Sequence, residues 1–133
     1  MNKLLSRVIT DGTGTAAELK NTQMAGKTGT SENWRDISFV GMTPDYLSAV
    51  WCGYPTGENP RAIEMANSAR IWYNVFGTYA DINASGKTFP ECETVSHEEY
   101  CVATGKRASE KCSDNEKLDG YFKPGDPYCD GNH

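Results

Sequence analysis

The residues with the clearest chemical potential lie in the stretch Ala-Gly-Lys-Thr-Gly-Thr, residues 25–30. Lys27 offers a positive charge, and Thr28 and Thr30 offer hydroxyl donors for a carboxylate. Gly29 has no side chain, so an extended peptide could lie along the edge of this segment as an added strand. An ordinary strand whose threonines serve only β propensity would show the same pattern without any function.

The same stretch contains Gly26-Lys27-Thr28, which matches the end of a phosphate-binding loop. That loop requires a glycine five positions earlier, where this chain has Asn21, and a helix that begins at the lysine. The residues after Lys27 run toward a strand instead. A nucleotide site is therefore not favoured.

Other short segments accompany the Lys-Thr-Gly motif at characteristic positions. They are Gly12-Thr-Gly14, Phe39-Val-Gly-Met-Thr-Pro44, Val50-Trp-Cys-Gly-Tyr54, Thr104-Gly-Lys106 and Tyr121-Phe-Lys-Pro-Gly125. Together with the motif, these segments resemble the C-terminal part of the transpeptidase domain of class A (bifunctional) penicillin-binding proteins. The resemblance covers residues 1–129 and is strongest over 8–54. Met42 and Cys52 depart from it, because they stand where an aromatic and an aliphatic residue are common.

The resemblance implies a peptidoglycan D,D-transpeptidase, in which a serine attacks D-Ala-D-Ala and a stem-peptide amine takes the acyl group. It implies catalytic roles for Lys27 and for Thr30, whose backbone N–H would be one of two oxyanion-hole donors. It implies that Thr28, Gly29 and Thr30 bind substrate. Stem peptides and β-lactams would be partners of the complete domain, with no metal or organic cofactor. The expected location is the cell envelope, outside the cytoplasm, with a membrane anchor upstream of this segment.

The chain lacks the nucleophile that this family uses, the serine of Ser-x-x-Lys. None of its nine serines is followed by lysine three positions later. Ser113-Asp-Asn115 has the spelling Ser-x-Asn, but it follows Lys27, whereas the family order places that element before the lysine. We therefore expect a fragment that holds one wall of an active site and is inactive alone.

Hydrophobic spacing and turn residues predict the elements that position the motif. Apolar residues recur at helical spacing over 2–9 and over 61–80. Three strand-like runs, 23–30, 37–42 and 47–54, are joined by short links and predict an antiparallel meander.

These elements predict an α+β fold class, with a three-stranded antiparallel sheet and flanking helices. The sequence offers no further strand to pair with 47–54, although long unpaired edges are usually covered. By resemblance, two strands from earlier sequence would lie there and complete a β-lactamase/transpeptidase-like fold. Residues 1–82 form the first predicted domain.

Residues 83–133 form the second predicted domain, an acidic cysteine-rich tail expected to be irregular. Residues 91–133 hold five Lys/Arg against ten Asp/Glu, which supplies the whole net charge of −5. Without a basic patch, the chain is a poor candidate for nucleic-acid binding. No apolar run approaches the ~20 residues of a membrane span.

Four of the five cysteines lie in this tail: Cys92, Cys101, Cys112 and Cys129. An even set in a polar segment favours two disulfides, with three possible pairings. Zinc is the less favoured alternative, because no Cys-x-x-Cys occurs and His97 and His133 lie outside the usual finger spacing. Disulfides indicate a compartment outside the reducing cytosol.

Two other functions stay open at this point. One is a secreted, disulfide-stapled, non-enzymatic module that binds cell-wall peptide or another protein. The other, ranked lower, is a β-lactamase relative. An open frame upstream of Met1 that encodes Ser-x-x-Lys and then Ser-x-Asn would favour the transpeptidase fragment, whereas a signal peptide there would favour the module.

Overall fold

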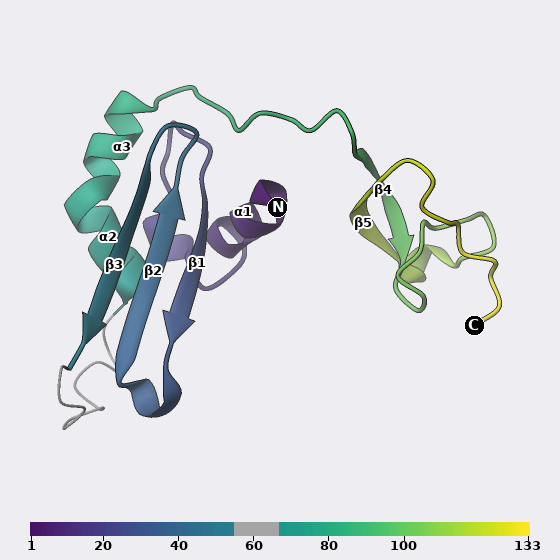
Figure 1. The fold of residues 1–133 in the computed structure, drawn as a ribbon, viewed down its shortest axis with the longest axis horizontal. Coiled ribbons are helices and arrows are strands. Elements are labelled where there is room, and N and C mark those ends of the chain that lie inside the picture. The colour runs from purple at the N-terminus through teal and green to yellow at the C-terminus, as the bar shows by residue number, and fades with distance from the viewer. Residues whose placement is uncertain (55–66) are drawn as a thin grey trace. The chain divides into compact units, whose positions relative to one another are not determined.

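The computed structural model describes residues 1–54 and 67–133. They form two compact units, Met1–Pro90 and Glu91–His133 (Figure 1). No helix in the described ranges is long and apolar enough to cross a bilayer.

The first unit is built on a three-stranded antiparallel sheet in the order β1-β2-β3. The strands are β1 (Ala25–Thr30), β2 (Asp36–Met42) and β3 (Leu47–Gly53). Helix α1 (Asn2–Thr10) precedes the sheet and contacts β1. The predicted α+β class and the predicted meander are therefore confirmed.

The helical segment after the sheet is less regular than its sequence pattern suggests. It consists of α2 (Ser68–Trp72), a π-helical turn (Tyr73–Gly77) and α3 (Thr78–Asn83). Apolar spacing predicts which face is buried, but it does not reveal the wider turn, because one π turn shifts the period by a single residue. The first part of the predicted helix, residues 61–66, lies outside the described residues.

The core of the first unit lies between the sheet and this helical segment. Phe39 and Trp72 are 0% and 1% exposed, and their rings meet edge to face with centroids 5.7 Å apart. The indole Nε1–H of Trp72 donates to the hydroxyl of Ser48 at 2.5 Å. A Cβ at Gly41 would lie 2.6 Å from the indole, so only glycine lets Trp72 approach β2 this closely.

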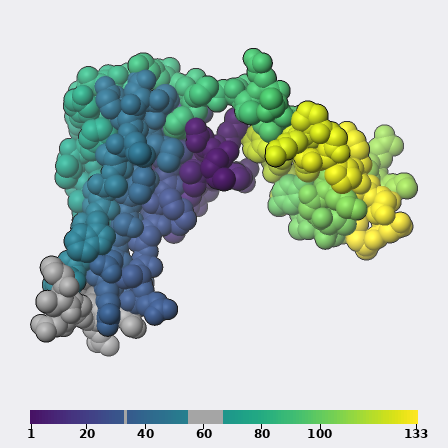
Figure 2. All heavy atoms as spheres, in the orientation of Figure 1, coloured from purple at the N-terminus to yellow at the C-terminus, as the bar shows by residue number. Residues whose placement is uncertain are grey.

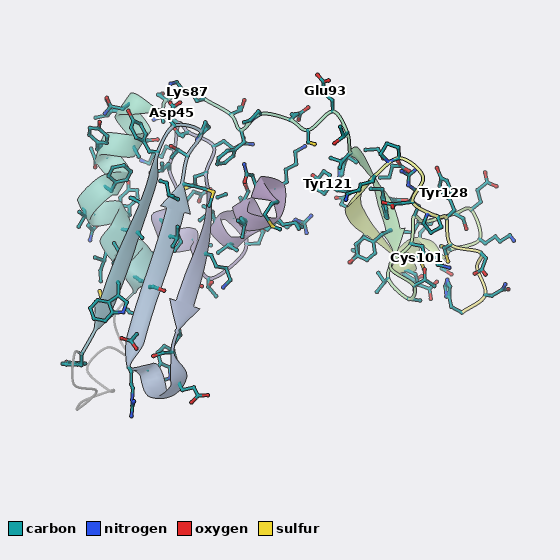
Figure 3. All side chains as sticks on the ribbon, in the orientation of Figure 1. Asp45, Lys87, Glu93, Cys101, Tyr121 and Tyr128 are labelled. Carbon is teal, nitrogen blue, oxygen red and sulfur yellow. The ribbon has the colours of Figure 1, made fainter. Side chains whose placement is uncertain are left out.

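Residues 84–90 are tied back to the first unit. The backbone N–H of Gln23 donates to the carbonyl of Lys87, and the Gln23 side chain accepts from the N–H of Phe89 at 2.7 Å. The Lys87 ammonium pairs with the carboxylate of Asp45, in the turn between β2 and β3 (Figure 3). These contacts explain why the first unit extends to Pro90, beyond the boundary at residue 82 that composition indicated.

The other face of the sheet carries large apolar side chains that are open to solvent. Val40, Leu47 and Trp51 share this face, because strand residues alternate between the two faces, and they are 36%, 71% and 60% exposed. Within the described part of the chain, β3 pairs only with β2. An apolar face beside an unpaired edge is typical of a sheet that other segments cover.

The second unit contains a two-stranded antiparallel sheet of β4 (Ser96–Cys101) and β5 (Lys117–Phe122). The expectation of wholly irregular structure is wrong for these strands. Their sequences, Ser-His-Glu-Glu-Tyr-Cys and Lys-Leu-Asp-Gly-Tyr-Phe, are rich in residues of low β propensity and lack a clean apolar alternation. In Figure 2 this unit, coloured from green to yellow, forms a packed body.

The cysteines also differ from expectation. All five lie in the described ranges, and all five are free. The structure therefore shows neither of the two predicted disulfides. Cys92 is exposed, with its sulfur 3.1 Å from the Thr94 hydroxyl, whereas the other three tail cysteines are buried together.

Candidate functional site

Strand β1 carries all four predicted site residues in one row. Its register with β2 pairs Lys27 with Val40 and Thr30 with Ile37. Among the described residues, β1 pairs with no strand other than β2 (Figure 1). The motif therefore occupies an edge strand whose outer side has no strand partner in the described chain.

The side chains of the row point to two different faces of the sheet. Lys27 and Gly29 share the open face with Val40, whereas Thr28 and Thr30 lie on the opposite face. Lys27 and Thr30 are exposed, and Thr28 and Gly29 are half-buried. The structure thus brings the predicted residues together along the edge rather than on one face.

The backbone N–H and C=O groups of β1 point alternately toward β2 and toward the outer edge of the sheet. The N–H of Ser31 donates to the carbonyl of Asp36 at 2.9 Å, which continues the ladder between β1 and β2 by one pair. Antiparallel pairs alternate between those that exchange hydrogen bonds and those that do not. The alternation directs the N–H and C=O groups of Thr28 and Thr30 toward the outer edge. The Lys27 ammonium already donates to the Thr28 carbonyl there, at 2.7 Å.

The loop that follows α1 forms a hydrogen bond to the row on β1. The hydroxyl oxygens of Thr13 and Thr28 lie 2.6 Å apart, so that one hydroxyl donates to the other. Thr13 stands in the Gly-Thr-Gly segment, which follows α1, and the N–H of Gly14 donates to the Val8 carbonyl at 2.8 Å. This contact was missed from sequence, where the loop stood out only through the family resemblance. The signal that could have suggested it is a hydroxyl between two glycines, a small polar group on a backbone free to approach closely.

The turn after the row is closed by a pair of polar side chains. The Ser31 hydroxyl accepts from the N–H of Asp36 at 2.8 Å and donates to the Asp36 carboxylate at 3.0 Å. Between them, Trp34 adopts φ of +55°, the left-handed region that non-glycine residues rarely enter, and its side chain is 47% exposed. Asp36 therefore both begins β2 and fixes the turn that ends β1.

Potential metal ligands belong to the second unit, and they are not among the predicted site residues. Within the described ranges, one group of histidine, cysteine or carboxylate ligands converges, and it consists of Cys101, Cys112, Cys129 and His133. His97, the other histidine, lies 3.5 Å from the carboxylate of Asp119 and stacks on Tyr121.

Comparisons with known sequences find relatives that carry one family name. No protein-family model matches the chain. The chain is 37% identical over 106 residues to penicillin-binding protein 1A of Clostridium tetani, which covers 75% of this chain and 13% of that protein. It is 29% identical over 141 residues to penicillin-binding protein 1A/1B of Bacillus subtilis, which covers 92% of this chain and 15% of that protein.

A solved structure shows the same fold. The crystal structure of penicillin-binding protein 1A from Haemophilus influenzae matches with a TM-score of 0.69 at 17% identity, over 93% of this chain and 19% of that one. The chain spans less than a fifth of the length of each of these three relatives. It belongs to the class A penicillin-binding proteins, as part of their transpeptidase domain.

Proposed function

We propose that β1 forms one wall of a D,D-transpeptidase active site, which cross-links peptidoglycan stem peptides and is acylated by β-lactams. The observation that carries the proposal is the outer edge of β1, which presents Lys27, Thr28, Gly29 and Thr30 without a strand partner in the described chain. An extended peptide can add to such an edge through main-chain hydrogen bonds.

The groups along this edge suit an acyl-transfer substrate that ends in a carboxylate. Lys27 brings a positive charge beside the nucleophile's proton network, and Thr28 and Thr30 bring hydroxyl donors. The outward N–H of Thr30 suits one of the two oxyanion-hole donors, a group whose loss typically lowers the rate by ~10²–10³-fold. Lys27 would exchange its bond to the Thr28 carbonyl for the bound substrate.

The remaining parts of the site would come from other segments of the complete domain. No serine of this chain has the Ser-x-x-Lys spacing, so the nucleophile and its activating lysine are expected elsewhere. The exposed apolar face of Val40 and Trp51 and the unpaired edge of β3 support such a completion. The working protein would act in the cell envelope, outside the cytoplasm.

Covalent labelling with a fluorescent penicillin tests the proposal. We expect the purified 133-residue chain to show no label that survives denaturation, because it has no Ser-x-x-Lys nucleophile. The longer protein that includes the preceding segments should label stoichiometrically. Stable label on the 133-residue chain would contradict the missing nucleophile, and absence of label from both would favour the non-enzymatic binding module.

A substitution in the longer protein tests the role of the row itself. Lys27→Ala should slow acylation at least about 100-fold, in line with the loss of one electrostatic contact in the transition state. Lys20→Ala, which removes another exposed lysine outside the row, is the matched control and should leave the rate unchanged. Equal rates for Lys27→Ala and the unsubstituted protein would overturn the assignment.

A further inference from the structure

The second unit brings together three cysteines and a histidine from distant parts of its sequence. One ligand atom from each of Cys101, Cys112, Cys129 and His133 lies within 4.8 Å of all the others. The Cys101 sulfur is 3.3 Å from Nε2 of His133. The three cysteines are 0%, 4% and 3% exposed. Figure 3 labels Cys101 inside this unit.

We propose that Cys101, Cys112, Cys129 and His133 form a structural Zn²⁺ site. Three thiolates and one imidazole are a set that zinc binds tetrahedrally, and four protein ligands leave no open position for catalysis. With zinc–sulfur bonds of about 2.3 Å, neighbouring sulfurs in a tetrahedron lie about 3.8 Å apart. Each sulfur–sulfur separation therefore needs to contract by no more than about 1 Å to hold the ion.

The turn after β4 holds the first ligand, Cys101, in a fixed position. Cys101 ends β4, its N–H donates to the Lys106 carbonyl at 2.8 Å, and its own carbonyl accepts from Gly105 at 2.7 Å. These two backbone hydrogen bonds fix the turn that carries the Cys101 sulfur.

The backbone also fixes the second and third ligands. The N–H of Cys112 donates to the Ser109 carbonyl at 3.1 Å, and the N–H of Cys129 donates to the Arg107 carbonyl at 2.7 Å. Both cysteines are therefore anchored to the segment that connects β4 with β5.

The last four residues curl so that the fourth ligand returns to the cluster. Gly131 has φ of +78°, and the N–H of Asn132 donates to the Asp130 carboxylate at 3.2 Å. A Cβ at Gly131 would lie 2.6 Å from Cβ of Lys111, next to Cys112. Both the positive φ and the close approach of Lys111 therefore require glycine at position 131. The bend that this glycine permits places His133 against Cys101.

The small size of the unit explains why a metal would be needed. The buried apolar cluster found in the second unit consists of the three cysteines, with Ala108 packed against it. A unit of 43 residues rarely buries enough apolar surface to fold without a staple. Zinc binding adds folding free energy directly, because the unfolded chain has no preformed site.

A disulfide accounts for the cluster less well. It would join two of the three buried sulfurs and leave the third without a partner in the cluster, because the remaining tail cysteine, Cys92, is exposed and lies outside the cluster. It would also give no reason for an imidazole 3.3 Å from the Cys101 sulfur. Zinc uses all four groups at once.

Metal analysis of the untagged 133-residue chain tests the proposal. After purification with reductant and zinc and thorough removal of free metal, we expect about one Zn²⁺ per chain. The chain reconstituted with Co²⁺ should show thiolate-to-cobalt charge transfer and the strong visible bands of a tetrahedral site. The cobalt spectrum reports the ligands of the unsubstituted chain, so it does not depend on a variant that folds.

Matched substitutions identify the ligands. Cys101→Ser, Cys112→Ser, Cys129→Ser and His133→Ala should each weaken zinc binding at least about 100-fold, more than is typical for loss of an outer partner. Cys52→Ser, Cys92→Ser and His97→Ala should leave it unchanged. Absence of stoichiometric zinc and of a tetrahedral cobalt spectrum would overturn the proposal. So would equal losses in both sets, or a disulfide among the three buried cysteines of the native chain.

Discussion

At the scale of single residues, the row on β1 depends on contacts made by its neighbours. The Thr28 hydroxyl is held by Thr13, and the Thr28 carbonyl is held by the Lys27 ammonium. Thr30, in contrast, is exposed at the end of the strand. The two threonines therefore differ in what they do for the fold, although both are proposed to bind substrate.

The substitution Thr28→Val separates these two roles. Valine keeps the β-branched shape but removes the 2.6 Å bond to Thr13, so we expect the free energy of unfolding to fall by about 0.5–1.5 kcal/mol. Urea denaturation of the chain measures this change. The control Thr30→Val, on the same face, should stay within about 0.5 kcal/mol of the unsubstituted chain. Equal losses for the two variants would contradict a structural role for the Thr13–Thr28 contact.

Two glycines of the sheet differ in how readily the side chain next to them can move. A Cβ at Gly41 would meet the buried ring of Trp72 at 2.6 Å, whereas a Cβ at Gly29 would meet the hydroxyl of Ser38 at 2.5 Å. A buried indole cannot move without disturbing the core, but a serine hydroxyl can rotate to another rotamer. Gly41→Ala should therefore destabilise the chain by about 1–3 kcal/mol, and Gly29→Ala by clearly less. Thermal or urea unfolding of the two variants compares them, and the reverse order would refute the argument.

At the scale of elements, the packing of the helical segment against the sheet depends on Trp72. Its ring meets Phe39 and Phe76 edge to face, and its Nε1–H reaches Ser48 on β3. This single residue therefore joins the helix to both the central and the outer strand.

Trp72→Phe keeps an aromatic ring at this position but removes the indole N–H. We expect a loss of about 1–3 kcal/mol, because the variant leaves a smaller ring in a close-packed core and the Ser48 hydroxyl without its partner. In a Ser48→Ala background the same change should cost less, since the hydrogen bond is already gone. A double-mutant cycle from urea denaturation measures the difference. Identical costs in the two backgrounds would show that the bond contributes nothing.

The sequence predicted those elements whose local chemistry is unambiguous. The turn Thr43–Tyr46 contains proline and aspartate, and the structure closes it with a hydrogen bond from the Thr43 N–H to the Tyr46 carbonyl at 2.8 Å. The π turn could not be predicted, because it leaves the apolar pattern almost unchanged. Strands β4 and β5 were missed because acidic residues in β4 obscure any strand pattern.

The convergence of ligands in the second unit was beyond sequence reasoning for a different reason. The intervals between Cys101, Cys112, Cys129 and His133 are ten, sixteen and three residues, which contain no Cys-x-x-Cys. Only the pairing of β4 with β5 and the bend at Gly131 bring these four residues to one point. The row at 25–30, in contrast, is contiguous, so its residues could be named before the fold was known.

At the scale of the whole molecule, the two units have separate cores of different kinds. The first unit buries aliphatic and aromatic side chains around Phe39 and Trp72, whereas the buried cluster of the second unit consists of three cysteines. The stability of the first unit should therefore depend on apolar packing, and that of the second on the proposed ion. Removal of the metal should affect the two units differently.

Hydrogen exchange of the zinc-loaded chain, measured by mass spectrometry before and after chelation, tests this independence. Chelation should raise amide exchange across β4 and β5, because the unfolding of the second unit is then no longer opposed by metal binding. Amides of β1, β2 and β3 should keep their protection, since no ligand of the cluster belongs to the first unit. Readdition of Zn²⁺ should restore the protection of 91–133, whereas Mg²⁺, which prefers oxygen ligands, should not. Equal deprotection of both units would mean that the proposed ion stabilises the chain as one cooperative body, and unchanged exchange in both would mean that the cysteine cluster folds without metal.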